Sequence, residues 1–170
     1  MQVLAPILAR WRLAALLASA AMLPIAHAFQ TFGGFAPCSL CLRQREVYWV
    51  AAAVALVAML VVRTRGGGRW KAPANFLLGL IFLASAGVAA YHAGVEWEWW
   101  PGPTACASGG GAVSAEAMAG LLAGDRIRPP ACDEAAWVFA GLSMAGWNVL
   151  ISLALAALSV MAAVRERSAR

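Results

Sequence analysis

Four long apolar stretches constrain the fold of this chain more than any other feature of its sequence. A helix needs about 20 residues, within a range of roughly 17–25, to cross the hydrocarbon core of a bilayer. Of the 170 residues, 62% are apolar and only 12% are charged, against about 25% charged residues in a soluble domain. We therefore predict an all-α membrane protein, a single bundle of four transmembrane helices. The spans cover about residues 13–29, 47–62, 74–91 and 143–164, and the two loops on the side opposite the termini cover about 30–46 and 92–142.

Basic residues are distributed unevenly between the two ends of these spans. Nine of the 13 precede the first span, lie between the second and third, or follow the fourth, whereas seven of the eight acidic residues lie in the two other loops. Basic residues concentrate on the cytoplasmic side of membrane proteins. The net charge of +5 therefore indicates orientation, not a nucleic-acid partner. We expect both termini in the cytoplasm and all the cysteines in the periplasm, where disulfides persist: Cys38, Cys41, Cys106 and Cys132.

Aromatic residues are placed at the outer ends of the predicted spans. Amphipathic rings are enriched at headgroup depth, so this placement predicts an aromatic belt at the outer interface. No acidic residue typical of an ion pathway lies within the spans, which disfavours a channel or a transporter. The residues of the predicted belt are Tyr48, Trp49, Tyr91, Trp97, Trp99, Trp100, Trp137 and Trp147.

Two segments allow more than one interpretation. The first span also fits a secretory signal peptide, because Arg10 and Arg12 precede an apolar run that ends in Ala26-His27-Ala28. Cleavage before Phe29 would leave three spans. In the long loop, residues 114–122 predict a short amphipathic helix that either lies on the membrane surface or packs on its own domain.

The Cys38-x-x-Cys41 pair has three possible uses: a metal site, an inert disulfide or a redox centre. A structural zinc site usually needs two close pairs, but Cys106 and Cys132 are 26 positions apart, so the spacing disfavours zinc. A disulfide that closes so short a loop would add little stability. A tight Cys-x-x-Cys pair is more typical of a redox centre.

Arg45 lies four residues after Cys41, so the two share a face if the second helix has begun by then. Its charge and the helix N-terminus would both favour a thiolate at Cys41. Binding of a lipid phosphate is an alternative role for Arg45. Two cysteine pairs on one side of a membrane predict a thiol–disulfide relay between a soluble partner and an oxidant in the lipid. A membrane quinone is an oxidant that needs no large binding fold.

With these residues the chain resembles the bacterial disulfide bond formation protein B (DsbB) family over nearly its whole length. The similarity includes Cys106 and Cys132 of the long loop. It also includes the stretches Pro37-Cys38-Ser39-Leu40-Cys41 with Arg45, Tyr91-His92, Cys132-Asp133-Glu134 and Phe139-Ala140-Gly141-Leu142-Ser143-Met144-Ala145-Gly146-Trp147.

The resemblance implies an inner-membrane thiol:quinone oxidoreductase that reoxidises a periplasmic DsbA-like thiol oxidase and reduces ubiquinone or menaquinone, without a metal. In this family pattern the partner attacks Cys106, Cys132 passes the exchange to Cys38, and Cys41 faces the quinone. The implied quinone-binding residues are Arg45, His92, Met144 and Trp147; for the last two, ordinary bundle packing is the alternative role.

Other functions remain open on the sequence. One is a paralogue that serves a single dedicated thiol partner, and another is a bundle similar to vitamin K epoxide reductases. A third is a non-enzymatic membrane scaffold with structural disulfides. The Gly- and Ala-rich stretch at 108–122 departs from the family pattern and leaves partner specificity open.

Overall fold

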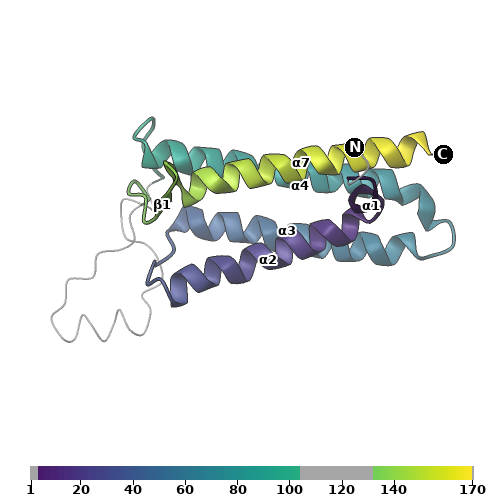
Figure 1. The fold of residues 1–170 in the computed structure, drawn as a ribbon, viewed down its shortest axis with the longest axis horizontal. Coiled ribbons are helices and arrows are strands. Elements are labelled where there is room, and N and C mark those ends of the chain that lie inside the picture. Colours follow the sequence, from purple (N-terminus) through teal and green to yellow (C-terminus); the bar gives the residue numbers. More distant parts are fainter. Residues whose placement is uncertain (1–3, 104–131, 170) are drawn as a thin grey trace.

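The computed structural model describes residues 4–103 and 132–169 of the chain (Figure 1). Four long helices within these ranges are long and apolar enough to cross a membrane, which confirms the predicted all-α membrane bundle. A short helix α1, Leu4–Ala9, precedes them, and a 3-10 turn η1, Gly67–Trp70, joins the second to the third. The long helices are α2, Trp11–Thr31; α3, Ser39–Val62; α4, Lys71–Glu96; and α7, Met144–Ser168.

The helices extend beyond the predicted spans because apolar runs mark only the part of a helix that suits lipid. The helix α3 begins at Ser39, well before residue 47, because Cys38 is its N-cap and accepts a hydrogen bond from the backbone N–H of Cys41 at 3.3 Å. The helix α4 continues to Glu96 and so carries His92 in its last turns. Because Cys38 caps α3 and Cys41 lies in its first turn, both cysteines of the close pair are fixed at the start of this helix.

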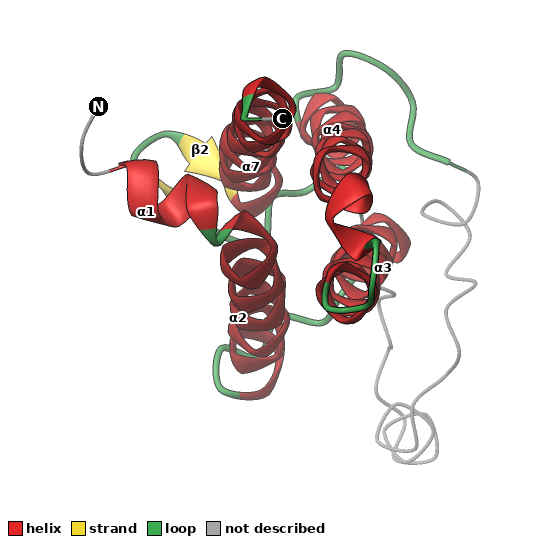
Figure 2. Cartoon of the chain, turned by 90° about the vertical axis from the view of Figure 1, so that its right-hand side faces the viewer, coloured by secondary structure: helices red, strands yellow, loops and turns green. Residues whose placement is uncertain are grey.

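The four long helices pack as two antiparallel pairs, α2 with α3 and α4 with α7, and α3 also packs against α4 (Figures 1 and 2). Small residues allow the close approach of α4 and α7. A Cβ atom added at Gly79 would lie 3.3 Å from the Cβ of Ser159 and 3.3 Å from Cγ2 of Val160. Close packing through small residues is typical of helices in lipid, where little hydrophobic force joins them.

The α1 helix, the η1 turn and the C-terminal end of α7 lie at one end of the bundle (Figure 1). Arg12 was expected to flank the first span, but it is buried in this part of the bundle. It donates a hydrogen bond to Oδ1 of Asn75 at 3.2 Å and lies 3.5 Å from a carboxylate oxygen of Glu166. These two polar partners allow the guanidinium charge of Arg12 to be buried. Since Asn75 lies on α4 and Glu166 on α7, Arg12 joins α2 to both helices.

At the other end of the bundle a small hairpin leads into α7. Its strands, β1, Val138–Phe139, and β2, Leu142–Ser143, are antiparallel. Ala140 and Gly141 between them both have positive φ, 51° and 78°, as a type I′ turn requires. Ser143 then caps α7, accepting a hydrogen bond from the backbone N–H of Gly146 at 3.1 Å. This hairpin was not predicted, because its two-residue strands are too short to show a strand pattern in the sequence. The short helix predicted at residues 114–122 lies outside the described residues.

Candidate functional site

The two cysteines of the close pair lie together at the N-terminus of α3. Their Sγ atoms are 2.9 Å apart, and both are free thiols. A disulfide has a length of about 2.0 Å, so a small side-chain movement would convert the pair from dithiol to disulfide. Cys38 is buried and Cys41 is partly exposed.

The environment of Cys38 favours its anion. The Cys41 thiol donates a hydrogen bond to Cys38 Sγ, and this bond lowers the pKa of the Cys38 thiol well below its ordinary value; burial opposes the effect and His92 adds to it. The helix N-terminus acts in the same direction, since Cys38 accepts from a backbone N–H of the first turn. In the reduced pair the anion is therefore favoured on Cys38, whereas the sequence analysis placed it on Cys41.

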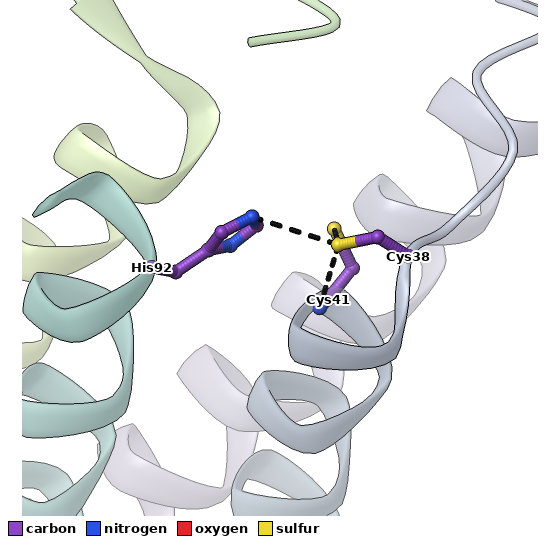
Figure 3. Close-up of side chains that lie close together, drawn as sticks. All are labelled: Cys38, Cys41 and His92. Carbon is purple, nitrogen blue, oxygen red and sulfur yellow. Dashed lines mark hydrogen bonds between the residues drawn. The ribbon is translucent and has the colours of Figure 1, made fainter. Parts of the chain in front are cut away.

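His92 reaches the pair from α4. Its Nε2 lies 3.5 Å from Cys38 Sγ, and Figure 3 shows the imidazole pointing across the bundle towards the two sulfur atoms. The ligand atoms of Cys38, Cys41 and His92 all lie within 4.8 Å of one another. The spacing gave no sign of this cluster, because the histidine comes from another helix. A structural zinc site is four-coordinate, and three such groups cluster here among the described residues, so the absence of a resident metal stays a prediction.

The structure brings Cys132 of the long loop against the close pair. Cys132 is 1% exposed and packs in one cluster with Cys38, Leu40 and Val95. Its Sγ lies 3.7 Å from Oγ of Ser39. Cys132 is disulfide-bonded, and Cys106, its predicted partner, lies outside the described residues. Two cysteines far apart in the chain, Cys38 and Cys132, are thus neighbours.

An apolar pocket lies beside the close pair, between all four long helices. It has a cavity volume of about 140 Å³, close to the roughly 150 Å³ that holds a benzene ring. Five of the predicted site residues line it: Cys38, Cys41, Arg45, His92 and Met144. Trp147 is not among the described lining residues and instead donates a hydrogen bond to the carbonyl oxygen of Phe139 at 3.0 Å.

Arg45 joins two walls of this pocket. Its Nη1 donates to Oε1 of Gln30 at 2.8 Å, and its Nη2 donates to the carbonyl oxygen of Ala26 at 3.1 Å. These bonds link α3 to α2 on both sides of the point before Phe29 where a signal peptidase would cut. Retention of the first span thus has a structural role, and the uncleaved chain stays a prediction.

Several buried polar residues near the pocket were missed or misassigned by the sequence analysis. Tyr48 was predicted in the outer aromatic belt, which is wrong, because it is 3% exposed and donates to Oδ1 of Asn148 at 2.6 Å. Glu96 accepts a hydrogen bond from the Ser143 hydroxyl, and its Oε1 lies 3.8 Å from Nε2 of His92. Gln44 contacts His92 Nδ1 at 2.8 Å. Gln44 was not predicted; its position three residues after Cys41, on the same helix face, is the signal that could have identified it.

Comparisons with known proteins identify the family of the chain. The family model described as "Disulfide bond formation protein DsbB" matches residues 9–162. The "Disulfide bond formation protein B" of Dechloromonas aromatica (strain RCB) is 27% identical over 152 residues, 85% of this chain and 86% of that protein. The protein of the same name from Aromatoleum aromaticum (strain DSM 19018 / LMG 30748 / EbN1) is 32% identical over 143 residues, 79% of each chain. No solved structure shows a significant match to the chain.

The match covers α2, α3, α4 and α7 as far as residue 162, and it includes the Cys38-x-x-Cys41 pair, the histidine beside it and both cysteines of the long loop. The chain therefore belongs to the DsbB family of membrane proteins of disulfide bond formation.

Proposed function

We propose that this protein reoxidises a periplasmic DsbA-like thiol oxidase by thiol–disulfide exchange and passes the electrons to a membrane quinone. One observation carries the proposal: Cys38 and Cys132 belong to one buried cluster, and both cysteines of the close pair also line an apolar pocket. A pair so placed has access to the second cysteine pair and to a lipid-soluble oxidant. We place the protein in the bacterial inner membrane, with its termini cytoplasmic and its cysteines periplasmic.

The exchange moves two electrons and two protons from the partner to the close pair. A thiolate of the partner attacks Cys106 and breaks its disulfide with Cys132, which leaves as a thiolate. Cys132 attacks Cys38 and breaks the Cys38–Cys41 disulfide. The partner's second thiol then releases Cys106, and Cys106 restores the bond to Cys132. The partner ends as a disulfide and the close pair as a dithiol, so the bonds formed and broken balance.

The redox state of the described cysteines fits the end of this sequence. Cys132 is disulfide-bonded, while Cys38 and Cys41 are free thiols. The bond from the Cys41 thiol to Cys38 Sγ and the nearby imidazole of His92 stabilise negative charge on Cys38. A sulfur so stabilised is a good leaving group when Cys106 attacks Cys132 in a Cys38–Cys132 disulfide.

The pocket residues suit a quinone headgroup. Its walls are mainly apolar, and Arg45 and His92 provide N–H groups of the kind that bind carbonyl oxygens. A bound quinone would accept two electrons and two protons from the Cys38–Cys41 dithiol and leave a disulfide. Such an oxidant is needed because DsbA-type oxidases have reduction potentials of about −120 mV, whereas those of ordinary structural disulfides lie below about −300 mV.

Quinone absorbance tests the proposal. The purified protein is mixed with a reduced DsbA-like partner and ubiquinone or menaquinone, and quinone reduction is followed with time. Turnover in the presence of the partner is expected, as is its loss when any of the four cysteines is replaced by serine. A non-enzymatic scaffold would leave the quinone absorbance constant, and turnover with one partner alone would indicate a dedicated paralogue.

A further inference from the structure

A line of buried polar side chains runs from the middle of the bundle to Cys38. It consists of Tyr48 and Gln44 on α3, Asn148 on α7 and His92 on α4, all of them buried. Burying a polar group in an apolar interior is unfavourable unless it is hydrogen-bonded. The thiol exchange described above requires none of these groups except His92, so the other three need an explanation.

Each member of the line bonds to the next. The Tyr48 hydroxyl donates to Oδ1 of Asn148 at 2.6 Å, and Nδ2 of Asn148 donates to Oε1 of Gln44 at 2.6 Å. Nε2 of Gln44 lies 2.8 Å from Nδ1 of His92. The other ring nitrogen of His92, Nε2, lies 3.5 Å from Cys38 Sγ. The line therefore ends at the sulfur that the fold favours as an anion.

The carboxamide of Gln44 has one accepting end and one donating end. Its Nε2 also donates to the carbonyl oxygen of Leu40 at 3.5 Å, and a backbone carbonyl can only accept. Turning the amide over would set its oxygen against that carbonyl and its NH₂ against the NH₂ of Asn148. Gln44 therefore presents an N–H to His92, and Nδ1 of His92 must accept it.

We propose that Gln44, held by Asn148 and Tyr48, is a positioning residue that keeps His92 in the tautomer protonated at Nε2. The Nε2–H then points at Cys38 Sγ and donates to the sulfur whenever it carries negative charge. Among the described residues, Glu96 is a further charged group near this nitrogen, with Oε1 3.8 Å away, and when ionised it can only accept from Nε2–H. The benefit to thiol exchange rests on the proposed function, whereas the tautomer does not.

The chain offers an internal control for a direct measurement. It has two histidines. Nδ1 of His27 lies 2.9 Å from the carbonyl oxygen of Leu23, so this ring must carry its proton on Nδ1. The full-length reduced protein, labelled with ¹⁵N-histidine and held in lipid bilayers, should thus show two opposite neutral tautomers at alkaline pH. Nitrogen NMR distinguishes protonated from unprotonated ring nitrogens.

Two matched substitutions assign the cause. Gln44→Glu keeps the shape but replaces the donating end with an oxygen, so His92 should switch to the tautomer protonated at Nδ1 while His27 stays unchanged. Gln30→Glu makes the same chemical change on α2, where the side chain bonds Arg45, and should leave the His92 signals in place.

The His92 spectrum of the unmodified protein can refute the proposal by itself, so the test still holds if a variant fails to fold. A His92 protonated at Nδ1, or an equal mixture of tautomers, would overturn it. The proposed function fails separately: absent quinone turnover with an Nε2-protonated His92 would remove the relay and leave the positioning role of Gln44 intact.

Discussion

Replacing Arg45 with alanine should weaken quinone binding by an amount that the structure allows us to work out. The substitution removes two hydrogen bonds that join α3 to α2 along the pocket wall, to Gln30 and to Ala26. Interhelical hydrogen bonds in membrane proteins contribute about 0.6 kcal/mol each on average. Two such bonds hold the pocket wall with about 1.2 kcal/mol, so losing the wall should weaken quinone binding by at most roughly eightfold.

The effect should appear in KM and not in kcat. The hydrogen bonds of Arg45 go to α2 and, in the described part of the chain, not to either sulfur of the close pair. Loss of an interaction that is equal in the ground and transition states raises KM alone. The assay is the initial rate of quinone reduction as a function of quinone concentration, with the reduced thiol partner in excess.

Arg43→Ala is the matched control for this experiment. It removes the same charge two positions away, but the side chain of Arg43 is 71% exposed and, among the described residues, pairs only with Glu46, which is 61% exposed. An exposed pair of this kind contributes little, so its KM should stay at the parent value. An unchanged KM for Arg45→Ala, or the same rise in both variants, would refute the role of Arg45 at the pocket and support a lipid-phosphate contact.

Three further predictions concern the sulfur chemistry and the packing. The pKa of Cys38 is lowered, mainly by the bond from Cys41. Cys38 in the reduced protein should therefore stay reactive towards iodoacetamide about two pH units below the ordinary thiol pKa of about 8.5. Cys41→Ala should raise the pKa of Cys38 and slow its alkylation at that pH, and equal rates in the two proteins would contradict this. Trp11→Phe removes a hydrogen bond to Oγ of Ser159 at 2.9 Å, and should lower the free energy of unfolding in detergent by about 0.6–1.7 kcal/mol without changing quinone kinetics. Gly79→Val should force α4 and α7 apart, because a Cβ there already lies 3.3 Å from the Cβ of Ser159, and should cost about 1–3 kcal/mol; unchanged stability in the same unfolding assay would show that the helices are not closely packed.

The sequence was sufficient to predict the bundle because each span is a local property. Apolar runs identify a membrane helix without knowledge of its neighbours, and all four were found. The starts and ends of the helices were less clear, because they depend on caps. Cys38 and Ser143 begin α3 and α7 through side chains that accept backbone N–H groups, and neither stands out in an apolar profile.

The site was only partly predictable because it is assembled from four helices and a loop. The motif Cys38-x-x-Cys41 and the resemblance pointed to the sulfur atoms, Arg45 and His92. The sequence did not reveal that Gln44 and Asn148 meet between α3 and α7, since only the packing of the helices sets that contact. Tyr48 was misplaced for the same reason: an aromatic residue at the start of a span suits an interface, and only its partner Asn148 shows that it points inward.

The contact between the two cysteine pairs is the central claim of this account, and one disulfide tests it most directly. The structure places Cys132 in one buried cluster with Cys38, and Cys41 packs against that cluster. In a variant with Cys41→Ser and Cys106→Ser, mild oxidation should therefore join Cys38 to Cys132 within one chain, and peptide mass mapping should recover that linked pair. If Cys38 and Cys132 remain free thiols under conditions that oxidise the parent protein, the relay between the pairs is wrong.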